Sequence, residues 1–369
     1  MTFRGKGFFT WKLTLAEGGN PAQIAATAKS AGLSHLALKI ADGKYPYHGV
    51  FGNPRDYVTP TVDALRAAGI QVWGWHYVYG ADPIREAEIA IRRVKQYNID
   101  LYAIDAEKEY KAPGMGYAAR RFMNRLRSAL PDLPIALCSY RYPSMHPQLP
   151  WKEFLDKCDY SMPQVYWQAR HDPAYQLERC YREYQTRVPA RPLIPVGAAY
   201  REHGWQSTAE DVQEFLHKAQ ELNLSAVTFW EWTDARSSLL PGVWEAVANT
   251  HWPGDPVEPN MGEKLIAALN ARDTGALTDL YLPTSVHITS GRTVQGGSNI
   301  RQWYTELLNK TLPQATFKLS GFAGSLGNIH HMTWTADSPA GKVDNGKDTI
   351  GLLGGKIAYH YSFFTVNKA

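Results

Sequence analysis

The chain has 369 residues, of which 44% are hydrophobic and 20% are charged, and its formal net charge is +4. This composition is typical of a globular protein with a sizeable core, and the length predicts more than one domain. A small net charge without a basic block gives no sign of nucleic-acid binding, and no apolar run reaches the length of about 18 residues needed for a membrane span.

The three cysteines, Cys138, Cys158 and Cys180, form no CxxC pair and have no histidine at the spacing of a zinc site. We therefore expect buried, reduced thiols, with no disulfide framework, no metal and no cofactor. Residues 1–8 contain no apolar signal-peptide core. The sequence predicts a cytoplasmic protein unless another route exports it.

From residue 7 to about residue 250, apolar runs alternate with amphipathic helical patterns. The apolar runs predict strands over 7–13, 36–40, 71–77, 101–106, 134–140, 160–166, 193–198 and 226–232. The helical patterns cover 21–31, 61–68, 83–96, 118–129 and 208–223. This order predicts an α/β fold, a (β/α)8 barrel of the TIM type. An open doubly wound sheet is the alternative, but no glycine-rich phosphate loop follows the first strand.

Residues 251–260 contain three prolines and a glycine, which predicts a linker. The sequence thus predicts a barrel over 1–250 and a second domain over 261–369. Within the second domain, helical patterns over 261–272, 273–281 and 299–309 precede strand patterns over 315–321, 329–336 and 356–366. Helices followed by strands predict a small α+β domain with a curved antiparallel sheet.

Two carboxylates end the fourth expected strand, in the run Ile104-Asp105-Ala106-Glu107. Alternate residues of a strand face the same way, so Asp105 and Glu107 are expected on one face, about 6–7 Å apart. Two acids so close raise the pKa of one of them, which leaves one protonated and one ionised group for general acid and base chemistry. Capping of the next helix, or pairing with Arg or Lys, is the structural alternative.

Polar and aromatic residues also follow the other strands, on the barrel face where such barrels keep their reactive groups. The candidates are Lys39, Trp75, His76, Tyr140, Gln164, Tyr166, Trp230, Glu231 and Trp232. Lys39 is expected to pair with Asp105 or Glu107. Strand alternation predicts that Trp230 and Trp232 share a face while Glu231 points the opposite way. A hydrogen-bonded core position is the alternative for His76, and plain packing for the tryptophans.

These strand ends resemble the glycoside hydrolase (β/α)8 superfamily, above all its family 25 lysozyme-like group. The matching pieces are the strand 36–43 with its lysine and glycine, Gly74-Trp75-His76-Tyr77, Asp105-Ala106-Glu107, and the aromatic-Glu-Trp-Thr ending of strand eight. Residues 100–107 and the stretch 162–166 are also similar to family 18 chitinase-like barrels, with Ala103 where one acid is expected. The resemblance implies that Glu107 donates a proton and Asp105 assists it. It implies a polysaccharide or oligosaccharide of amino sugars, peptidoglycan or chitin-like, as the partner.

The chain departs from family 25 at two strand ends. Thr10-Trp11-Lys12 stands where that family carries an aspartate, and Gln164 and Tyr166 stand near its acid on strand six. Cleavage assisted by the substrate's N-acetyl group would need only Asp105, Glu107 and a tyrosine such as Tyr166. Two other functions stay open. One is a barrel that binds carbohydrate without cleaving it, and the other is an enzyme of another class that uses Lys39 and Glu231, for example through a Schiff base.

Residues 261–366 resemble SnoaL-like or nuclear-transport-factor-2-like domains, which are cones around an apolar pocket. The resemblance rests on residues 268–273, 280–281, 300–304 and 357–361. It implies ligand binding, or pairing of two chains into a homodimer, rather than catalysis. The histidines of this domain are expected to face solvent from the sheet rather than to line a pocket; they are His287, His330, His331 and His360.

Overall fold

The computed structural model describes residues 3–50, 55–253, 259–324 and 328–368. The chain forms two compact units, Met1–Asp255 and Pro256–Ala369, and each is described by itself. The division falls within the proline-rich segment 251–260, of which residues 254–258 lie outside the described residues. No described helix combines the length and the apolar character that crossing a membrane requires.

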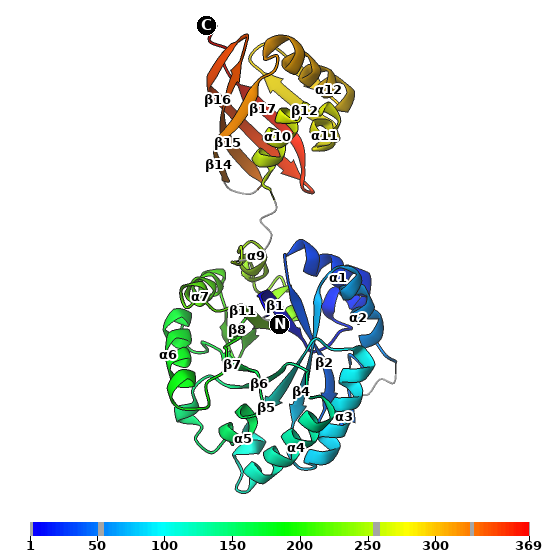
Figure 1. Cartoon of the computed structure of the whole chain (residues 1–369), viewed down its shortest axis with the longest axis vertical. Helices are drawn as coiled ribbons and strands as arrows, with labels where there is room; N and C mark the ends of the chain where they lie inside the picture. The colour runs from blue at the N-terminus through cyan, green and yellow to red at the C-terminus, as the bar shows by residue number, and fades with distance from the viewer. Residues whose placement is uncertain (1–2, 51–54, 254–258, 325–327, 369) are drawn as a thin grey trace. The chain divides into compact units, whose positions relative to one another are not determined.

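The first unit is a closed barrel of eight parallel strands surrounded by helices, as the alternating sequence pattern predicts (Figure 1). The barrel strands are β1 (Gly5–Thr10), β2 (His35–Asp42), β4 (Gln71–Val78), β5 (Leu101–Ala106), β6 (Ile135–Tyr140), β7 (Tyr160–Val165), β8 (Val196–Ala198) and β11 (Ala226–Trp230). The ring closes because β1 pairs with both β2 and β11. A short strand, β3 (Tyr45–Pro46), pairs antiparallel with the end of β2.

The starts of several helices follow from local capping. The side chain of Asn20 caps the first helix, and Pro21 occupies its first turn. Thr208 and Asp211 form a capping box at the start of α7. The helices of this unit are α1 (Pro21–Ser30), α2 (Val58–Ala67), α3 (Pro83–Tyr97), α4 (Met115–Ala129), α5 (Trp151–Leu155), α6 (Pro173–Thr186), α7 (Ala209–Glu221), α8 (Trp232–Ala235) and α9 (Val243–Ala248). Of these, α5, α6, α8 and α9 were not predicted.

Alternation along the strands sorts side chains between the barrel interior and the layer beneath the helices. On β4, Trp73 and Trp75 face the interior and pack there with Leu101 and Ala103 of β5. Asp105 is the next alternate residue of β5. It therefore points into the mouth of the barrel.

The second unit is an α+β fold with a six-stranded sheet in the order β13-β12-β17-β16-β15-β14. Its strands are β12 (Tyr281–Thr289), β13 (Thr293–Gln295), β14 (Thr316–Gly324), β15 (Ile329–Ser338), β16 (Gly341–Leu353) and β17 (Lys356–Phe363). The helices α10 (Met261–Asn270), α11 (Thr274–Asp279) and α12 (Gly297–Glu306) share a hydrophobic core with the sheet. Register shifts interrupt the pairing of β14 with β15 and of β15 with β16. The sequence predicted the class of this unit but not β12, β13 or β16.

Candidate active site

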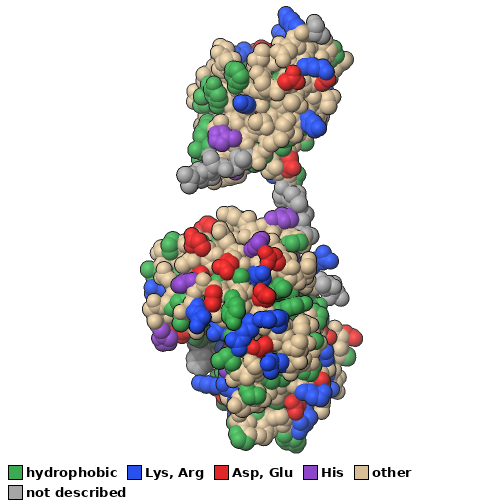
Figure 2. Space-filling model, turned by 90° about the vertical axis from the view of Figure 1, so that its left-hand side faces the viewer, with side chains coloured by type: hydrophobic (Ala, Val, Ile, Leu, Met, Phe, Trp, Pro, Cys, Tyr) green, Lys and Arg blue, Asp and Glu red, His purple; other side chains and the backbone are tan. Residues whose placement is uncertain are grey.

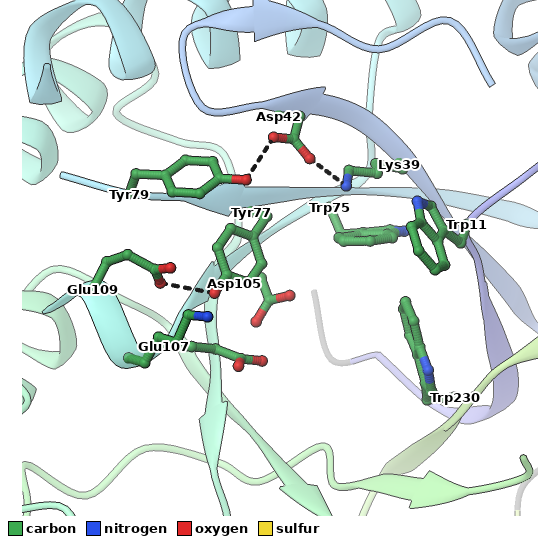
Figure 3. A pocket seen from close by; sticks show the side chains of 11 residues that line it. Trp11, Lys39, Asp42, Trp75, Tyr77, Tyr79, Asp105, Glu107, Glu109 and Trp230 are labelled. Atoms are coloured by element: carbon green, nitrogen blue, oxygen red, sulfur yellow. Dashed lines mark hydrogen bonds and ion pairs between the residues drawn. The ribbon is translucent and has the colours of Figure 1, made fainter. Parts of the chain in front are cut away.

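The strand ends of the barrel surround two adjoining hollows. The first has a volume of about 420 Å³ and lies between the ends of β2, β4, β5 and β11 (Figure 3). The second has a volume of about 530 Å³. Both fall within the range of roughly 300–1,000 Å³ that is usual for ligand sites. Trp11, Glu107 and Trp230 line both hollows, so Glu107 lies where the two meet.

Asp105 and Glu107 form the expected pair of carboxyls. Asp105 is 8% exposed, and the amide nitrogen of Gln164 donates to Asp105 Oδ1 at 3.2 Å and to Glu107 Oε1 at 2.8 Å. Burial, followed by the negative charge of Glu107, raises the pKa of Asp105 well above its usual range, and the two carboxyls are hydrogen-bonded to each other. Asp105 therefore releases its proton at a higher pH than an ordinary aspartate does. The structure thus brings Asp105, Glu107 and Gln164 together.

Lys39 lines the first hollow, but the expectation that it pairs with Asp105 or Glu107 is wrong. Its ammonium lies 2.5 Å from Asp42, and the hydroxyl of Tyr79 donates to the other oxygen of Asp42 at 3.0 Å (Figure 3). Asp42 ends the same strand as Lys39, three residues further along, and lies nearer to its ammonium than the acids of β5. The charge of Lys39 still reaches Asp105 and partly opposes the rise in its pKa.

Aromatic rings form one wall of the first hollow. The ring of Trp230 lies 5.3 Å from that of Trp75 and 6.4 Å from that of Trp11, centroid to centroid. Trp11 is 42% exposed, which makes a flat apolar face accessible from the groove. Such faces stack well against the apolar faces of sugar rings. Trp75 and Trp230 were predicted to line the site, whereas Trp11 was noted only as a departure from an acid.

Five further lining residues were not among the predicted site residues; Asp42 and Tyr77 lie in the last two residues of β2 and β4, and the other three follow β4 or β5. These are Asp42, Tyr77, Tyr79, Lys108 and Glu109. The hydroxyl of Tyr77 donates to Glu109 Oε2 at 2.8 Å, and burial together with this bond raises the pKa of Tyr77. In the sequence, only their position marks these residues: each lies within a few residues of the carboxyl end of a barrel strand.

The second hollow contains the remaining predicted catalytic candidates. Tyr166 lines it, and burial raises the pKa of its hydroxyl well above the usual range. Glu231 also lines it, as expected for a side chain that faces the barrel opening. Its Oε1 accepts from the backbone of Asp234 at 3.1 Å, and burial raises the pKa of Glu231 while hydrogen bonds from Thr233 and Asp234 oppose the rise. A second carboxyl is therefore available on this side of Glu107.

Three predicted binding residues do not line either hollow among the described residues. His76 is completely buried between Tyr102 and the carbonyl of Gly43, because its side chain points away from the barrel interior. Trp232 is buried in the first turn of α8, where it packs on Phe8, so it does not share a face with Trp230. The ring of Tyr140 stacks on His146 with centroids 3.8 Å apart, and burial and then the charge of Glu107 raise the pKa of its hydroxyl to about 12.

No group of three or more His, Cys, Asp or Glu side chains that could hold a metal occurs in the described part of the chain. The three cysteines are free and buried, as predicted. Acidic and basic side chains both occur on the face of the barrel unit shown in Figure 2. That face therefore does not carry a single sign of charge.

In the C-terminal unit, the expectation that His287 and His360 face solvent is wrong. His360 is 2% exposed, and its Nδ1 lies 2.5 Å from the hydroxyl of Tyr281, which contacts the hydroxyl of Tyr304 at 2.6 Å. The other ring nitrogen of His360 lies 3.1 Å from Asp348. His287 is completely buried and stacks on His360, and burial lowers its pKa to about 2. His360 thus belongs to a polar network inside the unit, whereas His287 contacts it only through its ring, since neither of its ring nitrogens has a hydrogen-bond partner among the described residues.

The other two histidines of this unit lie toward the sheet surface. His331 is exposed and contacts the hydroxyl of Thr349 at 2.9 Å, which confirms the expected solvent-facing position. The ring of His330 is half-buried and stacks on Phe322. A hollow of about 240 Å³ in this unit is bordered by Trp303, among others.

No protein-family model and no curated protein matches the chain. Among solved structures, the spore cortex-lytic enzyme SleL of Bacillus megaterium is 11% identical, with 68% of this chain and 75% of that chain covered and a TM-score of 0.48. The GH2 β-galacturonidase of Eisenbergiella tayi is 13% identical over 67% of this chain and 51% of that chain, with a TM-score of 0.49. An NTF2-like protein of unknown function from Cytophaga hutchinsonii is 12% identical over 28% of this chain and 84% of that chain, with a TM-score of 0.24. Sequence identities of 11–13% with TM-scores below 0.5 carry no conclusion about a reaction of this chain.

Proposed function

We propose that the barrel is a glycoside hydrolase that cleaves an amino-sugar polysaccharide, peptidoglycan or chitin-like, by general acid catalysis from Glu107. The observation that carries the proposal is the hydrogen-bonded pair of Asp105 and Glu107 at the junction of two hollows. A glycan chain that passes through both hollows would place a glycosidic bond beside Glu107. The tryptophan wall on one side would stack against a sugar ring.

The pair supplies the proton that the leaving group needs. In the proposed mechanism the pair holds one proton, because burial of Asp105 and the charge of Glu107 raise the pKa of Asp105. When that proton lies on Glu107, it can pass to the glycosidic oxygen as the bond to the anomeric carbon breaks. The negative charge left on the pair is then stabilised by the amide of Gln164, which donates to both carboxyls.

The substrate's own N-acetyl group supplies the nucleophile in this proposal. Its carbonyl oxygen attacks the anomeric carbon as the glycosidic bond breaks. Water then attacks that carbon, the bond to the carbonyl oxygen breaks, and a proton of the water passes to Glu107. Tyr166 lines the same hollow as Glu107, and its raised pKa keeps a hydroxyl proton that can stabilise the attacking group. The route needs no acid on strand one, where Trp11 stands. Glu231 is the alternative second carboxyl if water or a carboxylate attacks directly.

The first prediction tests the proton donor. The change Glu107→Gln removes the transferable proton but keeps the size of the side chain, so turnover should fall by roughly 10²–10⁴-fold. Release of reducing ends from N-acetylglucosamine oligomers and from peptidoglycan measures the rate. The thermal unfolding midpoint of the variant should match the parent within a few degrees, and equal rates for the two proteins would remove Glu107 from this role.

A carbohydrate-binding barrel without turnover is the second candidate, and the observation that favours it is Trp11 in place of a strand-one acid. This function predicts that calorimetry detects oligosaccharide binding, while neither the parent nor the Glu107→Gln variant releases reducing ends. Schiff-base chemistry is less well supported, because the amine of Lys39 is engaged by Asp42. Borohydride trapping of a carbonyl substrate on Lys39 would revive it.

A further inference from the structure

A tight hairpin follows the seventh barrel strand. β9 (Arg201–Glu202) and β10 (Trp205–Gln206) pair antiparallel a few residues after the end of β8. The two turn residues, His203 and Gly204, have φ angles of 50° and 80°. Positive φ at both positions is the geometry of the two-residue turns that join strands most closely. The hairpin is therefore a short and well-defined projection.

The hairpin is anchored to the proposed site by aromatic and polar contacts. The ring of Tyr200 meets that of Tyr166 edge-on at 5.3 Å, and Trp205 meets Tyr200 edge-on at 5.7 Å. The amide of Gln168 donates to Glu202 Oε2 at 2.9 Å. These contacts connect the projection to a residue that lines the second hollow, so its position relative to Glu107 is set by packing.

The hairpin also extends the depression that the first and second hollows form. Residues 201–206 line a third hollow of about 310 Å³, which shares Arg201 and Glu202 with the second hollow. The depression therefore continues from Glu107 to the hairpin. Arg201 and Gln206 are exposed and lie opposite each other in the pairing register, which places both on one face. Their guanidinium and amide groups can hydrogen-bond the hydroxyl and acetamido groups of sugars.

We propose that the hairpin Arg201–Gln206 is an outer glycan-binding subsite, which holds sugars beyond those next to the bond at Glu107. This inference rests on the function proposed for the barrel. A chain that occupies all three hollows must extend on the hairpin side of the cleaved bond. The barrel should therefore prefer longer oligosaccharides and cut within a chain.

The double change Arg201→Ala with Gln206→Ala tests the subsite. It removes the two exposed side chains and keeps the turn, the backbone pairing and the bond from Gln168 to Glu202. With N-acetylglucosamine hexamers, kcat/KM should fall about tenfold, as expected for the loss of two hydrogen bonds. With the shortest oligomer that the parent cleaves, the fall should be smaller, because of the two side chains only that of Arg201 also borders the second hollow. Arg187→Ala, at an exposed position beyond the end of α6, is the control and should change neither value.

A binding measurement separates this inference from the proposed reaction. Hexamer binding to the Glu107→Gln variant is compared by calorimetry with and without the hairpin changes, and a roughly tenfold weaker Kd is expected. The subsite would be overturned if the hairpin changes left the hexamer's Kd and kcat/KM unaltered, or if they lowered kcat/KM equally for the hexamer and the shortest oligomer. It would also be overturned if the hexamer did not bind at all. If the parent binds but never cleaves, and the hairpin changes weaken binding, the hydrolase proposal fails and the subsite is supported.

Discussion

At the residue scale, the proposed chemistry of the barrel depends on the raised pKa of Asp105 beside Glu107. Asp105 is buried at the end of β5, and its raised pKa is caused first by burial and then by the charge of Glu107. The proton is present below this raised pKa and is lost as the pH rises through it. A general acid that depends on the pair therefore works on the acidic side of that value and fails on the alkaline side.

The second prediction follows from this loss of the proton at alkaline pH. In the Asp105→Asn variant, the carboxyl with the raised pKa is replaced by an amide that does not titrate. The alkaline limb of kcat against pH should move to lower pH, and kcat at its optimum should fall by about 10–100-fold. The measurement is a pH–rate profile on an N-acetylglucosamine oligomer. An alkaline limb at the parent's position would show that Asp105 does not control the proton.

His76 shows that a position beside the site need not be in it. Its ring lies 2.7 Å from the hydroxyl of Tyr102 and 2.7 Å from the carbonyl of Gly43, and burial lowers its pKa to about 4. The third prediction is that His76→Ala lowers the free energy of unfolding by roughly 2–4 kcal/mol, through a cavity and two lost hydrogen bonds. Urea unfolding measures this. KM for the oligosaccharide in the folded fraction should stay within about twofold, and a larger change would return His76 to the binding site.

At the element scale, strands with clear alternation were predictable from the sequence. β5 spans Leu101–Ala106, as the apolar run predicts, and its alternation correctly directs Asp105 into the barrel mouth. The prediction is wrong where a strand was extended too far. β11 ends at Trp230, and Glu231 already caps α8, so alternation does not apply to Trp232. A periodic pattern describes side-chain directions only while the element lasts.

The fourth prediction separates the two tryptophans. Trp232→Ala should lower the free energy of unfolding by about 3–5 kcal/mol, because this ring is completely buried against Phe8 and Trp244. Trp230→Ala should mainly weaken glycan binding, because this ring is only partly buried and lines both hollows. Chemical unfolding and calorimetric binding of a hexamer, run on both variants, measure the two effects. Equal binding losses would contradict the assignment of Trp232 to the core.

Elements with weak patterns could not be predicted. β16 (Gly341–Leu353) has buried Val343 and Ile350, but it also buries Asp348, and charged residues follow one another along its exposed positions. A buried acid breaks the apolar alternation on which strand prediction depends. For the same reason, His287 and His360 were assigned to the surface, since the sequence does not show which partners satisfy a buried polar group.

At the scale of the whole molecule, the two units each have their own core. The C-terminal unit contains a continuous chain of contacts from Tyr304 through Tyr281 and His360 to Asp348, which also accepts from Ser362 at 2.6 Å. Burying these groups is unfavourable unless each finds a partner, so the network is sensitive to the loss of one member.

The fifth prediction uses Asp348 to test whether the units are energetically separate. Asp348→Ala removes the partner of both His360 and Ser362 and leaves their polar groups unsatisfied in the core, which should destabilise the C-terminal unit by about 2–4 kcal/mol. In scanning calorimetry of the full chain we expect two transitions, of which this change lowers one. Turnover of short oligosaccharides at 25 °C should match the parent, because the proposed catalytic groups all belong to the barrel. The exposed change Asp344→Ala on the same strand is the control. A shift of both transitions together would show that the two units unfold as one.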